Sequence, residues 1–526
     1  MSGRSIRRAI STFASLGLVL AFGAAAPPPA GAAGTGLETL EKQVREFTLP
    51  NGLKFIVVER HEAPVFSYQT VVNSGSADDR LGATGLAHMM EHMAFKGTNV
   101  VGTRDWAAEK TAMDRVETAW NALHAERDKG ARADTAALQR LAQAFGAAQE
   151  KAQEYVVPNE SDRILEAAGA QNVNASTSDD VTRYFYSIPS NRLELWALME
   201  GARMSHPVFR EFYKERDVVY EERRMRTESS PVGRLIDEFI HAGFVAHPYQ
   251  FGGIGFPSDI HAFSRTEGEE FFRRHYVARN MTVAVVGDVT LDALRKQAET
   301  YFGEVSNGPP PPPIDVIEPE QRAERRVILE DVAQPMFAVA WHIPAVTDPS
   351  YAACEALVDL LAGGDYARLN KVLVKERKVA VQVQGFTGFP GEKYPNLMGF
   401  FVVPAAGQDP ARVEAALYDL LDQIEHKSPF TADELHGYQV RVRADRIRGA
   451  DSNGTLAENL ATYQTLHGDW REFFREQERV QSLTVGDLMN VMSQRMVRSN
   501  RTVGMIVNPK PPAAPGRSAA TPRAAR

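Results

Sequence analysis

The chain has 526 residues, more than one ordinary domain holds, so two or more domains are expected. Hydrophobic residues make up 44% of it and charged residues 24%, values typical of globular proteins. A net charge of −8 excludes a general nucleic-acid binder, which carries a basic surplus. The single cysteine, Cys354, excludes an intrachain disulfide, a cysteine-based metal cluster and a redox pair.

Residues 1–33 have the pattern of a secretory signal peptide. An arginine-containing start precedes an apolar run from Phe13 to about Ala26, and small residues follow it. A membrane anchor or an Arg-rich transit peptide would share part of this pattern, but the run is short for a span and no basic flank follows it. No other apolar run is long enough to cross a bilayer. We therefore expect export and a periplasmic, or otherwise secreted, mature protein.

Residues 45–58, "REFTLPNGLKFIVV", predict two strands joined at Asn51-Gly52, a strong hairpin signal. The pattern of the next segment, "ERHEAPVFSYQTVV" (59–72), returns in "EDVAQPMFAVAW" (330–341). A second pair, "NMTVAVVGD" (280–288) and "NRTVGMIVN" (500–508), is also similar. These pairs indicate the first and last strands of a duplicated domain.

The first repeat is about 50 residues longer than the second, which predicts an insertion. Apolar residues fall at helical spacing on both sides of Gly130 and Asp134, so residues 103–158 are expected to form a helical hairpin. We therefore expect four segments after the signal peptide. They are an N-terminal domain at 34–305, a Pro-rich linker at 306–315, a C-terminal domain at 316–508 and a disordered Pro/Ala-rich tail at 509–526.

The segment "GLAHMMEHMAFKGT" (85–98) carries the clearest chemical signal. In a helix, His88 and His92 lie on one face with Glu91 beside them, the inverted form H-x-x-E-H of a zinc-peptidase motif. A structural zinc site would need a fourth protein ligand and would leave Glu91 without a task. The alternative is a pair of hydrogen-bonded core histidines on an amphipathic helix.

A catalytic zinc ion takes three protein ligands and keeps one open position, so a further ligand is needed. The segment "EFYKERDVVYEERRMR" (211–226) is the richest source, but a surface helix with salt bridges would have a similar composition. The residues alone leave four candidates open: Glu211, Glu215, Glu221 and Glu222.

From about Glu46 to Asn508, the sequence resembles the pitrilysin/insulinase family of zinc peptidases, which includes the mitochondrial processing peptidase. Residues 85–98 match the family's first zinc helix. "ERDVVYEERRMR" matches its second, which implies Glu222 as the third ligand and Glu215 as a supporting acid. The implied fold is α+β, with two homologous domains that are each an antiparallel β-sheet backed by helices.

The resemblance implies a zinc-dependent metalloendopeptidase with one zinc ion per chain, held by His88, His92 and Glu222, and with Glu91 as the general base. Its expected substrates are peptides or unfolded segments. The segment "NASTSDDVTRYF" (174–185) matches the family's substrate-binding edge strand. The substrate-binding residues implied are Asn174, Ala175, Ser176 and Thr177. Without the resemblance, an ordinary Thr/Ser-rich strand would be the simpler interpretation.

One segment departs from the family pattern. Where the second domain of relatives has a segment like "LREKRGLAY", whose Arg and Tyr bind substrate, this chain has "LVKERKVAV" (373–381), with Val374 and Val381 at those places. The second half also lacks the zinc set. We therefore expect the zinc-bearing subunit of a heterodimer, whose homologous partner supplies the Arg and Tyr. The alternatives are a homodimer and a non-catalytic peptide-binding or structural subunit.

Overall fold

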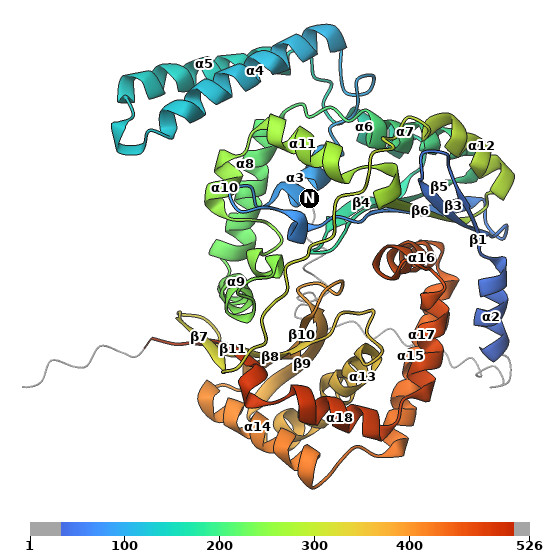
Figure 1. The fold of residues 1–526 in the computed structure, drawn as a ribbon, viewed down its shortest axis with the longest axis vertical. Helices are drawn as coiled ribbons and strands as arrows, with labels where there is room; N and C mark the ends of the chain where they lie inside the picture. The colour runs from blue at the N-terminus through green and yellow to red at the C-terminus, as the bar shows by residue number, and fades with distance from the viewer. Residues whose placement is uncertain (1–32, 510–526) are drawn as a thin grey trace, which may run out of the picture.

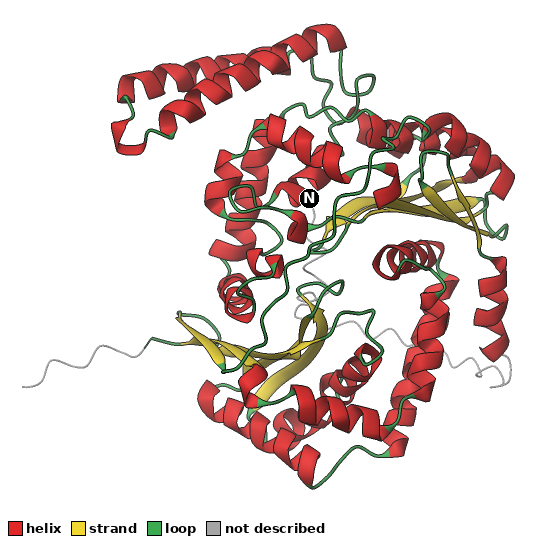
Figure 2. Ribbon diagram, viewed as in Figure 1, coloured by secondary structure: helices red, strands yellow, loops and turns green. Residues whose placement is uncertain are grey.

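The structure is a computed structural model that describes residues 33–509. All but one residue of the predicted signal peptide, and all but one of the predicted tail, lie outside the described residues. Two β-sheets lie one above the other, with helices around and between them (Figures 1 and 2). The α+β fold class is confirmed.

The first sheet has six strands in the order β1-β2-β6-β3-β5-β4. Their bounds are β1 Arg45–Thr48, β2 Lys54–Glu59, β3 Val65–Val72, β4 Gln171–Thr177, β5 Thr182–Pro189 and β6 Met281–Gly287. The β1–β2 hairpin turns at Asn51-Gly52 as predicted, and Gly52 has a φ of 96°, which favours glycine. β4 is an edge strand, so one side of its backbone is free to pair.

The second sheet has five strands in the order β7-β11-β8-β10-β9. Their bounds are β7 Arg325–Glu330, β8 Met336–Ile343, β9 Ala380–Phe389, β10 Asn396–Pro404 and β11 Arg501–Val507. In the first sheet the last strand, β6, lies between β2 and β3, and in the second sheet the last strand, β11, lies between β7 and β8. Each last strand is parallel to the first of its two neighbours and antiparallel to the second. The two sheets thus share a topology, as a duplication predicts. Neither is purely antiparallel, because β6 runs parallel to β2 and β11 runs parallel to β7.

The helices of the first half lie before, between and after its strands in the chain. They are α2 Ala33–Gln43, α3 Leu86–Met93, α4 Trp106–Arg127, α5 Thr135–Gln153, α6 Glu160–Ala167, α7 Leu193–Ser205, α8 Phe212–Arg223, α9 Pro231–Gly243, α10 Pro257–Ala262, α11 Arg265–His275 and α12 Leu291–Tyr301. Those of the second half are α13 Tyr351–Ala362, α14 Pro410–His426, α15 Ala432–Asp451, α16 Asn453–His467, α17 Glu472–Ser482 and α18 Val485–Arg495.

The two halves exchange helices. α16 of the second half packs on β3 and β6 of the first sheet, where Leu456 and Leu460 join a buried cluster with Ile56. α9 of the first half packs on β7 and β11, where Phe239 joins a cluster with Ala338. Both faces of the central strands are apolar, so each sheet needs cover on two sides. The halves therefore share their cores (Figure 1).

The insertion is the predicted helical hairpin. α4 and α5 pack against each other at one edge of the molecule (Figure 1), and Trp120 of α4 contacts Tyr213 of α8. Asp105 and Asp134 cap their N-termini by accepting hydrogen bonds from backbone N–H groups of the first turns.

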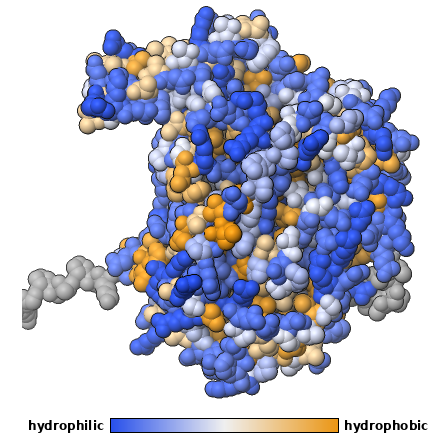
Figure 3. All heavy atoms as spheres, viewed as in Figure 1, coloured by the Kyte–Doolittle hydropathy of each residue, from blue (hydrophilic) through white to orange (hydrophobic). Residues whose placement is uncertain are grey.

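The surface seen in Figure 3 is largely hydrophilic, with apolar groups scattered over it. Between residues 33 and 509, no helix is both long enough and apolar enough to span a membrane.

Candidate metal centre

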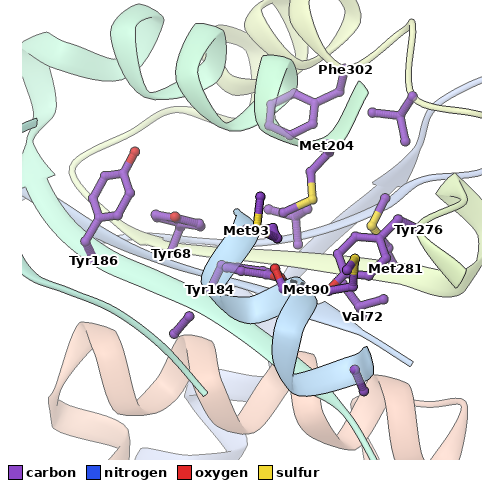
Figure 4. Close-up of a cluster of buried hydrophobic side chains, with 14 of the residues drawn as sticks. Tyr68, Val72, Met90, Met93, Tyr184, Tyr186, Met204, Tyr276, Met281 and Phe302 are labelled. Atoms are coloured by element: carbon purple, nitrogen blue, oxygen red, sulfur yellow. Dashed lines mark hydrogen bonds between the residues drawn. The ribbon is translucent and has the colours of Figure 1, made fainter. Parts of the chain in front are cut away.

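α3 is held in place at its start and along its apolar face. Asp79 accepts hydrogen bonds from the backbone N–H groups of Gly85 (2.7 Å) and Ala87 (3.0 Å), which have no partner within the helix. Gly85 has a φ of 100°, and a Cβ there would collide with the carbonyl oxygen of Ile254. Met90 and Met93 point into the aromatic core around Tyr184 and Tyr276 (Figure 4). The opposite face of α3 therefore presents its polar side chains in one direction.

α8 packs beside α3 and brings one glutamate to the two histidines. Oε2 of Glu222 lies 3.3 Å from Nε2 of His92 and 3.9 Å from Nε2 of His88. One potential ligand atom from each of these residues lies within 4.8 Å of the other two. The third member of the group, which the residues alone left open, is thus Glu222.

The other three glutamates of this segment have different surroundings. Glu215 lies behind His92, whose Nδ1 donates to its Oε1 at 3.0 Å, while the ammonium of Lys96 lies 2.5 Å from its Oε2. Glu211 pairs with Lys214, and Glu221 is an exposed partner of Arg224. Glu215 thus contacts the ring nitrogen of His92 that faces away from Glu222. Its role as a supporting acid stays a prediction.

The two histidines of the group differ in pKa. Burial lowers the pKa of His88 to about 3, so this imidazole is neutral and can offer a lone pair. Burial also acts to lower the pKa of His92, but its hydrogen bonds to Glu215 and Glu222 outweigh this effect and raise it to about 9.

The three carboxylates near the histidines also differ in pKa. Burial acts to raise the pKa values of Glu215 and Glu222, but the hydrogen bonds from His92 and the nearby positive charges lower both to about 2. Burial raises the pKa of Glu91, and its hydrogen bond with Thr177 only partly opposes this. Glu91 therefore holds a proton more readily than either of the other two acids.

The donor set fits a divalent transition metal. Two imidazoles and one carboxylate are the usual protein ligands of catalytic zinc. The second ring nitrogen of His92 is fixed by a carboxylate, as is usual for metal-binding histidines. Nδ1 of His88 is buried and has no hydrogen-bond partner among the described residues.

The group lies on the wall of a cavity of about 2110 Å³ between the two halves. β4 lines it with Asn174, Ala175, Ser176 and Thr177, and the second half contributes residues 386–390 and 451–455. Ser176 and Thr177 are half-buried, and Thr177 is hydrogen-bonded to Glu91. Ala175 is buried in the core cluster that includes Met89 of α3. The predicted strand is confirmed as an edge strand; its role in substrate binding stays a prediction.

Val374 and Val381 do not line this cavity as the structure describes it. Val374 packs against the core of the second half, and Val381 is 58% exposed. Arg226, which pairs with Glu222, was not singled out from the sequence, although its i,i+4 spacing from Glu222 is a usable signal. The cavity-lining segments of the second half carried no signal, since only the tertiary fold brings them there.

Comparison with known proteins agrees with this description. Residues 54–114 match the model "Insulinase (Peptidase family M16)", and residues 262–440 match "Peptidase M16 inactive domain". Zinc protease PqqE of Helicobacter pylori is 27% identical over 460 residues, covering 85% of this chain and 89% of that protein. The probable mitochondrial-processing peptidase subunit beta of Arabidopsis thaliana is 22% identical, covering 84% and 71%.

Solved structures share the fold. A protease from Helicobacter pylori has a TM-score of 0.73 at 24% identity, covering 88% of this chain and 99% of that one. The periplasmic protease PqqL from Escherichia coli has a TM-score of 0.66 at 18% identity, covering 89% of this chain and 48% of that one. The fold and the histidine–glutamate group are those expected of a zinc protease. The chain belongs to peptidase family M16.

Proposed function

We propose that this protein is a zinc-dependent endopeptidase that hydrolyses peptides or unfolded segments, with one zinc ion held by His88, His92 and Glu222. The observation that carries the proposal is the meeting of these three donors beside Glu91, on the wall of a large cavity. A zinc ion bound there would activate a water molecule as the nucleophile and polarise the peptide carbonyl group.

Glu91 acts as the general base in this proposal. It sits one position before His92 on α3, is not one of the three donors, and reaches the cavity. Its carboxylate accepts a proton from the attacking water and delivers it to the leaving amine. Its raised pKa suits both steps, because a strongly acidic carboxylate would be a poor base.

β4 binds the substrate as an added strand in this proposal. Its outer edge is unpaired within the first sheet, and Thr177 at its end is hydrogen-bonded to Glu91. Backbone pairing along Asn174–Thr177 would place a peptide bond beside the base with little demand on sequence. The cavity lies between the two halves and is lined by both, which favours short or unfolded chains over folded domains.

The proposal is tested by incubating the purified mature chain with a quenched fluorescent peptide library. We expect hydrolysis that a chelator abolishes and that added zinc restores. Hydrolysis that persists after complete metal removal would contradict the proposal. A protein that binds one zinc ion per chain without cleaving any peptide would point to the non-catalytic alternative or to a missing partner.

The exposed Val381 and the half-buried Val374 support the further proposal that a homologous partner subunit supplies the substrate-binding Arg and Tyr. A homodimer is the rival arrangement. The leader pattern of residues 1–33 and the similarity to the periplasmic protease PqqL of Escherichia coli support export to the periplasm. A monomer that is fully active in solution would contradict the need for a partner.

Glu215→Gln is expected to weaken zinc binding by about 10- to 100-fold, because the amide no longer provides the charged acceptor that orients His92. Competition with a chromogenic chelator measures this affinity. Glu221→Gln is the matched control, since Glu221 lies on the same helix but pairs only with Arg224 at the surface. Equal zinc affinities for the two variants would contradict the role of Glu215.

A further inference from the structure

Three arginines follow or overlap the end of α8, but only one of them contacts the metal-binding group. α8 ends at Arg223 and continues as a wider π-helical turn over Arg224–Glu228. Arg223 pairs with Asp237 of α9, and Arg224 pairs with the exposed Glu221. Arg226 pairs with Glu222. Isolated π-helical turns are frequent at functional sites.

The two oxygens of Glu222 have different partners. Oε2 faces the imidazoles, 3.3 Å from Nε2 of His92 and 3.9 Å from that of His88. Oε1 is paired with Nη2 of Arg226. Both side chains are mostly buried, with 16% of Glu222 and 25% of Arg226 exposed, so water competes weakly for this contact. A carboxylate free of such a partner could turn both oxygens towards a metal ion.

The turn that carries Arg226 is itself held in place. Gly233 of α9 packs directly on it, and a Cβ at this position would collide with the carbonyl oxygen of Arg226. The ion pair between Arg223 and Asp237, at 3.1 Å, ties the last residue of α8, directly before this turn, to α9. The guanidinium of Arg226 is therefore presented to Glu222 from a backbone that two independent contacts fix.

We propose that Arg226 is a positioning residue that engages one oxygen of Glu222, so that only the other is presented to the metal ion between His88 and His92. This inference rests on the proposed function, because it assumes that Glu222 is a metal ligand. The inference goes beyond the proposed function because it assigns a role to the guanidinium of Arg226, which sets how Glu222 binds the metal ion.

Two effects of Arg226 on zinc affinity have opposite signs. Its positive charge opposes a dication, so its removal alone would tighten zinc binding. Its hold on Glu222 orders the ligand, and loss of such a partner typically costs 10- to 100-fold in metal affinity. We expect the second effect to win, because the charge of Arg226 is already compensated by Glu222 itself.

The test measures zinc affinity by chelator competition for the full mature chain and its Arg226→Gln and Arg226→Lys variants. We expect about 10- to 100-fold weaker binding for Arg226→Gln and an intermediate loss for Arg226→Lys, which keeps the charge but not the planar guanidinium. Arg224→Gln is the matched control, from the same turn, and should bind zinc like the wild type. Unchanged or tighter binding by Arg226→Gln would overturn the proposal.

A second readout reports on the ligand directly. In the cobalt-substituted protein, freeing the second oxygen of Glu222 should change the visible absorption spectrum in Arg226→Gln but not in Arg224→Gln. An unchanged spectrum in Arg226→Gln would contradict the role assigned to Arg226. These measurements need no peptidase activity, so their failure is distinguishable from failure of the library experiment.

Discussion

Glu91→Gln is expected to lower peptide hydrolysis by about 10²- to 10⁴-fold, the usual contribution of a general base, while zinc affinity changes little. The side chain lies outside the three-donor group, so the amide should leave metal binding intact. Glutamine has nearly the same shape as glutamate and can keep the contact with Thr177, but it cannot accept a proton from water.

Two assays on the same preparation separate the base from the metal ligands. Zinc content and hydrolysis of the most sensitive library peptide are measured for Glu91→Gln, for Glu222→Gln and for the control Glu62→Gln. Glu62 is another carboxylate on the cavity wall, and its variant should retain both properties. Glu222→Gln should lose both. Normal cleavage by Glu91→Gln would refute the assigned base, whatever its zinc content.

The part of this site that could be predicted from the sequence is the part that one helix contains. His88, Glu91 and His92 are related by helical spacing alone, so a segment of a few residues indicates both the metal and the base. The choice among the glutamates of residues 211–226 depends on how α8 is rotated against α3. That rotation follows from side chains distant in sequence, and only the family resemblance selected Glu222 beforehand.

The fold also has parts that the local sequence predicts and parts that depend on contacts distant in sequence. The hairpin at Asn51-Gly52 and the helices around Gly130 follow from turn residues and periodicity, and both are present. The exchange of α9 and α16 could not be predicted in this way. An apolar helix face shows that a helix is covered, but not by which sheet, and here each helix covers the sheet of the other half.

The largest effect on stability is expected from the buried ion pair that ties the inserted hairpin to the metal centre. Nε of Arg210 lies 2.7 Å from Oε1 of Glu109 on α4, and the two residues are 1% and 0% exposed. The same guanidinium donates to the carbonyl oxygens of Thr98 (2.6 Å) and Val101 (3.0 Å), in the loop that follows α3. Arg210 thus joins the hairpin, the end of α3 and the start of α8.

Glu109→Gln is expected to lower the free energy of unfolding by about 3–5 kcal/mol, because it leaves a buried guanidinium without its counter-charge. Urea unfolding followed by circular dichroism measures this change. Lys110→Gln is the control, since Lys110 belongs to an exposed pair with Asp114 on the same helix and should cost at most about 1 kcal/mol. Equal losses for both variants would contradict the structural importance of the buried pair.

The double variant Glu109→Met/Arg210→Met separates the effect of an unpaired buried charge from the loss of the hydrogen bonds that Arg210 makes. The double variant has no unpaired buried charge, so its free energy of unfolding should be higher than that of Glu109→Gln. Recovery should be incomplete, because the carbonyl groups after α3 lose their donor and stay buried. Zinc affinity should be lower than that of the wild type, since the guanidinium no longer joins the loop after α3 to the start of α8. If the double variant bound zinc as tightly as the wild type, the hairpin would be shown to stabilise the chain without organising its metal centre.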